Sequence, residues 1–102
     1  MYIAIPVNSN DFKEAVVTTI ADSKVWALID FDEGVVKGIK EIPTWQEHGT
    51  DWLDFVVLEN KYENIMDFLN EGTTVLVRRE GQDSIDSIVE AFKFKELDEA
   101  GF

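Results

Sequence analysis

With 102 residues, 45% of them hydrophobic, the chain can bury one core, which predicts a single domain over residues 1–102 and excludes a disordered polymer. Its 21 acidic and 9 basic residues give a net charge of -12, which disfavours nucleic acid and membrane surfaces and favours a basic protein partner. Because it has no Cys, no apolar run of membrane-spanning length and no basic leader, we expect a cytoplasmic protein without disulfides or thiolate sites.

The first stretch, residues 2–7 (YIAIPV), is apolar at every position. A strand without a polar face is normally covered on both sides, so we expect this strand to lie at the centre of a sheet. Pro6 has no N–H to donate, and the turn formers Asn8, Ser9 and Asn10 follow it. We therefore expect strand pairing to stop at Pro6.

A hairpin follows, after a segment around residues 16–20 that we expect to be extended. Residues 24–31 and 35–42 flank the turn sequence Asp-Glu-Gly, in which Gly34 supplies the positive φ that a hairpin turn needs. Neither face of residues 35–42 is cleanly apolar and lysines interrupt it, which is typical of an edge strand.

The middle of the chain contains two capping patterns. Thr44 and Glu47 have the spacing of a capping box and predict a short helix that Gly49 limits. Residues 53–59 form an apolar strand pattern, after which the spacing of Asn60 and Glu63 repeats the capping pattern. Apolar residues at helical spacing then predict a helix that ends at Gly72: Tyr62, Ile65, Met66 and Leu69.

The last third repeats the alternation of strand and helix. Residues 73–79 read as a strand, and Asp83 or Ser84 can cap a helix with apolar positions at 85, 88, 89 and 92. Strands that alternate with helices are parallel and joined by right-handed crossovers. The predicted fold is therefore an α/β domain with a mixed five-stranded sheet, an antiparallel hairpin followed by parallel βαβ units, and flanking helices.

The sequence with these predicted elements resembles the dinitrogenase iron-molybdenum cofactor biosynthesis family, which consists of small proteins of the nitrogenase accessory X and Y type. Residues 1–7 (MYIAIPV) are similar to that family's opening strand, and residues 25–34 (VWALIDFDEG) to its hairpin. Residues 53–57 (LDFVV) and 72–77 (GTTVLV) resemble its fourth and fifth strands. The resemblance implies a ribonuclease H-like fold and a non-enzymatic carrier of an iron-sulfur or iron-molybdenum type cluster.

The resemblance also gives candidate cofactor-binding residues, His48 and Asn60, while no metal can be named. Members commonly carry a His-Phe-Gly-Arg-like loop where residues 19–23 read TIADS, and a glycine-rich loop where residues 59–62 read ENKY. Glycines there would let backbone N–H groups approach an anionic cluster. The alternative reading is therefore an interaction or regulatory module of the same fold that has lost cofactor binding, as a monomer or weak homodimer.

Other candidate residues have simpler readings beside the functional ones. His48 is the only histidine, and because one imidazole does not make a metal site, a solvated loop residue is the preferred reading over a ligand. Asp30, Asp32 and Glu59 could converge on Mg²⁺ as in a nuclease, although Asp is ordinary in a turn and the net charge opposes a nucleic-acid substrate.

Two further features read by default as a solvated helix face and as core filling, and in their functional reading as surfaces for a protein partner. Four acids spaced by four predict an acidic row on the helix before Gly72: Glu59, Glu63, Asp67 and Glu71. Trp45 and Trp52 flank the loop that replaces a helix of the family, so we expect one to cover the sheet and the other to stay partly exposed.

Overall fold

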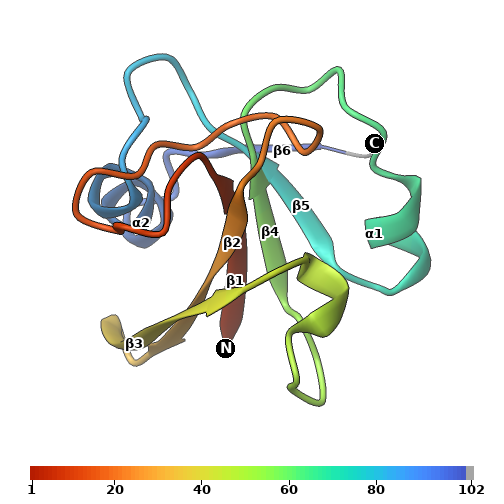
Figure 1. The fold of residues 1–102 in the computed structure, drawn as a ribbon, viewed down its shortest axis with the longest axis horizontal. Helices are drawn as coiled ribbons and strands as arrows, with labels where there is room; N and C mark the ends of the chain where they lie inside the picture. Colours follow the sequence, from red (N-terminus) through yellow and green to blue (C-terminus); the bar gives the residue numbers. More distant parts are fainter. Residues whose placement is uncertain (101–102) are drawn as a thin grey trace.

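The computed structural model describes residues 1–100, which form a six-stranded mixed sheet in the order β3-β2-β1-β4-β5-β6 (Figure 1). The strands are β1 Tyr2–Val7, β2 Val25–Asp32, β3 Val35–Ile42, β4 Phe55–Leu58, β5 Thr74–Val77 and β6 Asp98–Glu99. The helices are η1 Trp45–Glu47, a single 3₁₀ turn, α1 Met66–Asn70 and α2 Ile85–Lys93. The α/β class is confirmed, but the described sheet has six strands and not five, and a ribonuclease H-like arrangement stays a prediction.

The first strand lies at the centre of the sheet, as predicted. β1 pairs with β2 in antiparallel and with β4 in parallel direction. Pairing with β2 continues past Pro6 to Val7, opposite Val25, so the prediction that it stops at Pro6 is wrong. The Pro6 carbonyl accepts from the Thr18 N–H, which places the missing proline N–H on the side away from β2.

The hairpin is confirmed, and β3 is an edge strand. Its two turn residues both have positive φ, 52° at Glu33 and 78° at Gly34, as a two-residue type I′ turn requires. Glycine adopts this backbone freely, whereas glutamate is strained in it.

Glu33→Asn is expected to raise the free energy of unfolding by about 1 kcal/mol, because asparagine tolerates positive φ and Asn-Gly is the favoured type I′ pair. Urea denaturation of parent and variant measures the change. A midpoint at or below that of the parent would contradict the assignment of strain to Glu33.

Apolar side chains cover both faces of the sheet, which explains why β1 has no polar face. Ile3, Ile5 and Val7 lie in the cluster that packs against α2. Ala4 lies in the opposite cluster, which includes Trp45 of η1 and Phe68 of α1. The shared central strand therefore contributes alternate residues to two cores.

The helix on one side of the sheet, α2, matches its prediction, whereas the helices on the other side are shorter than predicted. Ser84 caps α2 as expected, with its Oγ accepting from the Ser87 N–H at 3.1 Å. Thr44 makes no side-chain cap, and only the 3₁₀ turn η1 follows it. The predicted helix before Gly72 is wrong in its first half, because residues 59–65 form a loop with one turn and only Met66–Asn70 are helical.

The short strand β6 was not predicted and runs antiparallel to β5 at the other edge of the sheet. Within residues 1–100, no helix is long and apolar enough to cross a membrane.

Candidate functional site

A cleft of about 1120 Å³ opens where the parallel strands β4 and β5 end. The loop after β4 lines it together with Arg78, Arg79 and residues 98–100. Ligands of open α/β sheets bind outside the carboxyl ends of the strands, so this cleft is the first place to look for a site.

Both arginines of the chain lie in this cleft, and each contacts acidic side chains. Arg78 Nη1 lies 2.8 Å from an Asp83 oxygen, and Arg78 Nη2 lies 3.6 Å from Glu59 Oε1. Arg79 Nε donates to Asp98 at 3.1 Å. Carboxylates thus already offset both guanidinium charges, which weakens any attraction for a further anion. The signal for this cleft in the sequence is the pair of adjacent arginines at the end of a predicted strand.

The structure places Asn60 in the wall of this cleft. Its side-chain oxygen accepts from the Tyr62 N–H at 2.9 Å, which closes a local Asx turn. The neighbouring Lys61 amine lies 5.5 Å from the centre of the Tyr62 ring, and that ring is 84% exposed. Asn60 therefore shapes the loop, and a role in binding a cofactor stays a prediction.

Glu63 points inward from the same loop and ties it to the segment before β2. Its Oε1 accepts from the Ile20 N–H at 2.6 Å, while Oε2 is buried without a hydrogen-bond partner in the described chain. Burial raises the pKa of Glu63, assisted by the nearby charge of Glu59, and the hydrogen bond from Ile20 opposes this rise.

Glu63 predicts a pH dependence of stability. A carboxyl group with a raised folded-state pKa binds its proton more tightly in the folded than in the unfolded protein. Ionisation of Glu63 therefore lowers stability progressively as the pH rises above the ordinary carboxyl pKa of 4.5, and the whole cost is present above the folded-state pKa.

Glu63→Gln cannot ionise and retains an oxygen for the Ile20 N–H. Relative to the parent, we expect this variant to gain stability as the pH rises from the pKa of the carboxyl group in the unfolded protein into the neutral range. Urea denaturation at several pH values measures the difference. A difference that is constant with pH would contradict the raised pKa of Glu63.

The structure places His48 in the loop between η1 and β4, which leads into the opposite end of that strand. The four residues of β4 alone separate the two loops by about 13 Å, so His48 and Asn60 do not come together. His48 Nδ1 is occupied locally, 2.7 Å from Thr50 Oγ1 and accepting from the Thr50 N–H at 3.1 Å. The residues named from the resemblance thus form no joint site, and their role as ligands stays a prediction.

The three acids considered for a magnesium site do not converge. β2 runs antiparallel to β1, so Asp30 and Asp32 lie at the end of the sheet where β1 begins. Glu59 follows β4, which runs parallel to β1, and therefore lies at the other end. Across residues 1–100, no three His, Cys, Asp or Glu side chains are grouped to hold a metal ion.

The acidic row is also not formed. Of its four members only Asp67 lies within α1, while Glu71 is its C-cap. Glu63 points inward to Ile20, and Glu59 faces Arg78. The row required a continuous helix from residue 59, which the structure does not have.

The two tryptophans differ as expected. Trp45 is buried, with its ring centre 4.5 Å from that of Phe68, whereas Trp52 is 55% exposed. The Trp52 ring lies against Gly72, where an added Cβ would come within 2.9 Å of it. Met66 and Leu69, on one face of α1, are also exposed, and Gly72 follows the end of that helix by two residues. Asp51, Asp67 and Glu71 are sequence neighbours of these apolar residues. We call Trp52, Met66 and Leu69 the α1 surface.

No family model matches the sequence, and no curated protein matches it. Solved structures do match it. The protein PH0822 has 20% identity and a TM-score of 0.73, covering 97% of this chain and 96% of that chain. A protein from Methanocaldococcus jannaschii, provisionally named a dinitrogenase, has 17% identity and a TM-score of 0.73, covering 97% and 93%.

A Thermotoga protein that is provisionally named NifB has 20% identity and a TM-score of 0.67, covering 96% of this chain and 91% of that chain. At these identities the likeness concerns the backbone and not the site residues. The chain therefore shares the fold of these proteins over nearly its whole length.

Proposed function

We propose that this chain is a non-enzymatic, cytoplasmic binding module on the dinitrogenase-related fold, and that its partner is a basic protein. The observation that carries the proposal is the α1 surface: half-exposed Trp52 lies against Gly72, just past the end of α1, and that helix exposes two further apolar side chains. Tryptophan is enriched among the few residues that dominate binding energy at protein interfaces. The net charge of -12 favours a basic partner and speeds its approach.

The local backbone supports Trp52 as an anchor. Gly72 has φ of +75° and leaves space that the ring fills, so the tryptophan lies on a fixed support. Thr73 follows, and its buried hydroxyl donates to the Leu53 carbonyl at 3.0 Å, which joins the Trp52 loop to the end of α1. A side chain held before binding loses less entropy when a partner covers it.

The loops that would carry a cluster favour this module over a carrier. A cluster ligated by protein side chains needs several convergent donors, and His48 and Asn60 lie at opposite ends of β4. Both arginines in the cleft are already engaged by carboxylates. These observations support the alternative in which the fold is kept and cofactor ligation is lost.

Carriage of a metallocluster as cargo is the second candidate. Two observations favour it: the neighbours named after dinitrogenase and NifB share this fold, and the cleft with Arg78 and Arg79 lies at the carboxyl ends of the parallel strands. In that case the guanidinium groups would attract an anionic cluster, with Asn60 in the adjoining wall.

A pair of labelled synthetic peptides tests the module. One is a Lys/Leu amphipathic helix, and its control has the same pattern with Glu in place of Lys. We expect the basic peptide to bind and Trp52→Ala to weaken it about tenfold, which corresponds to about 1.4 kcal/mol. Fluorescence anisotropy measures both affinities.

Val35→Ala is the matched control, because Val35 is 53% exposed on β3, far from the α1 surface in the sheet. It should leave peptide binding unchanged. Equal binding of the acidic peptide, or full binding by Trp52→Ala, would contradict the proposed surface.

Anaerobic reconstitution with iron, sulfide and molybdate separates the two candidates. For the module we expect no metal retained after desalting, in the parent as in His48→Ala and Asn60→Ala. Stoichiometric metal with a visible charge-transfer band, lost in either variant, would favour the carrier instead.

A further inference from the structure

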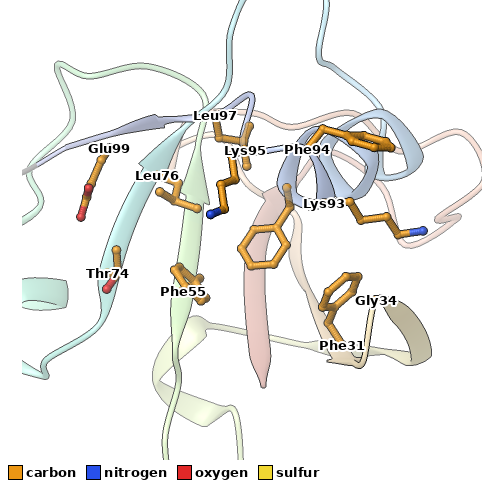
Figure 2. A pocket seen from close by; sticks show the side chains of 11 residues that line it. Phe31, Gly34, Phe55, Thr74, Leu76, Lys93, Phe94, Lys95, Leu97 and Glu99 are labelled. Carbon is orange, nitrogen blue, oxygen red and sulfur yellow. The ribbon is translucent and has the colours of Figure 1, made fainter.

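A second hollow of about 690 Å³ lies on the α2 side of the sheet and belongs to neither candidate above. Figure 2 shows it bounded by β4 and β5 on one side and by the end of α2 on the other. Its walls are mainly aromatic and aliphatic: Phe31, Phe55, Leu76, Phe92, Phe94 and Leu97. Its volume falls in the range of about 300–1,000 Å³ that is usual for small-molecule sites.

The aromatic rings fix the shape of this wall. Phe92 of α2 packs edge-on against Phe31 of β2 and Phe55 of β4, with ring centres 5.3 and 5.0 Å apart. Phe31 is buried, whereas Phe55 and Leu76 are only partly buried, because no helix within the described part of the chain covers β5 on this side. The hollow is therefore a preformed apolar surface rather than loose packing.

One cation reaches into this hollow. Lys95 follows the end of α2, and Figure 2 shows its side chain extending towards Leu76, whereas Lys93 points away to the other side. Glu99, the acid in the lining, lies across the hollow on β6. Among residues 1–100, no carboxylate lies within 4.0 Å of the Lys95 amine, although acids outnumber bases in the chain.

The backbone of Lys95 has a conformation that is uncommon for a residue other than glycine. Its φ is +57°, and the Glu96 N–H returns to the Ala91 carbonyl at 2.8 Å, which closes the helix end at the position where glycine is usual. A lysine in the left-handed region is strained, and strained residues cluster at ligand sites.

We propose that this hollow binds a small amphipathic anion, with an apolar body against Phe55, Leu76 and Phe92 and a carboxylate or sulfonate paired with Lys95. The apolar wall supplies affinity through the removal of water from its surface, and the lysine selects charge. The site is independent of the α1 surface, since the two lie on opposite faces of the sheet.

Two fluorescent probes that differ by one group test the proposal. 8-Anilinonaphthalene-1-sulfonate carries the anion, and N-phenyl-1-naphthylamine has the same aromatic body without it. We expect Lys95→Gln to weaken the sulfonate probe about tenfold, as for loss of a charged hydrogen bond, and to leave the neutral probe unchanged. Lys95→Arg keeps the charge and should retain the sulfonate.

Leu76→Trp fills the hollow and should weaken both probes, while circular dichroism reports whether this variant folds. Lys40→Gln removes a lysine from the opposite face, beside Leu28, and should change neither affinity. Unchanged sulfonate binding in Lys95→Gln would overturn the anion selection. Failure of the parent to bind the sulfonate, or indifference of both probes to a folded Leu76→Trp, would overturn the site.

Discussion

Phe68→Ala is expected to lower the free energy of unfolding by about 3–5 kcal/mol, a large part of the 5–15 kcal/mol typical of a domain. Phe68 is 1% exposed and lies between two tryptophans, with ring centres 6.3 Å from Trp26 and 4.5 Å from Trp45. Truncation removes these contacts and leaves a cavity that the surrounding rings can only partly close.

The expected loss is large because α1 has little stability of its own. It spans five residues, far fewer than the roughly 12–15 that an isolated helix needs, and lacks a side-chain N-cap. Phe68 is its one fully buried residue, so this side chain holds the helix on the sheet.

Urea denaturation of the two proteins measures the effect. Leu69→Ala on the same helix is the control, because Leu69 is 36% exposed and should cost well under half as much. Equal losses in the two variants would show that α1 responds to helix propensity and not to the packing of Phe68.

The sequence pattern predicted an element correctly where a local signal favours the same structure that tertiary packing requires. An apolar run predicted the central strand, and an Asp-Glu-Gly turn predicted the hairpin, because each signal depends on few neighbours. The same holds for α2, where Ser84 caps a helix whose apolar positions face the sheet.

The helix expected from residue 60 failed because side chains compete with the backbone for hydrogen bonds. The side chains of Asn60 and Asn64 accept from the N–H groups of Tyr62 and Met66, and Glu63 turns inward to Ile20. The apolar period alone cannot reveal a partner that is 43 positions away. The strand β6 was missed for a similar reason, since two exposed acids carry no strand pattern.

The candidate site was less predictable than the fold. His48 and Asn60 each follow from a resemblance of loops, yet sequence order does not say which end of a strand a loop occupies until the strand direction is known. Because β4 runs parallel to β1, the loop before β4 and the loop after β4 lie at opposite ends of the sheet. The hollow beside α2 has no signal in the sequence, because its phenylalanines have the pattern of ordinary core residues.

Gly72→Val is expected to cost about 2–3 kcal/mol and to weaken binding at the α1 surface. Gly72 has φ of +75°, where a β-branched residue is a genuine outlier, and such strain costs of order 1–3 kcal/mol. A Cβ here also lies 2.9 Å from the Trp52 ring, which must swing outward to make room.

Two comparisons divide the loss between backbone and ring. Gly72→Asn adds the same Cβ but tolerates positive φ, so it should cost less than half as much while still displacing Trp52. Gly72→Val in a Trp52→Ala background removes the contact and should recover only the smaller part of the loss, because the exposed ring can move. Full recovery there would show that the contact, not the backbone, requires glycine.

The peptide assay then connects this residue to function. If Trp52 anchors a basic partner from a fixed position, Gly72→Asn should weaken the Lys/Leu peptide although the protein stays folded, since the ring has lost its support. A folded Gly72→Asn protein with parental affinity would mean that exposure of Trp52 is enough and that its position is not preorganised.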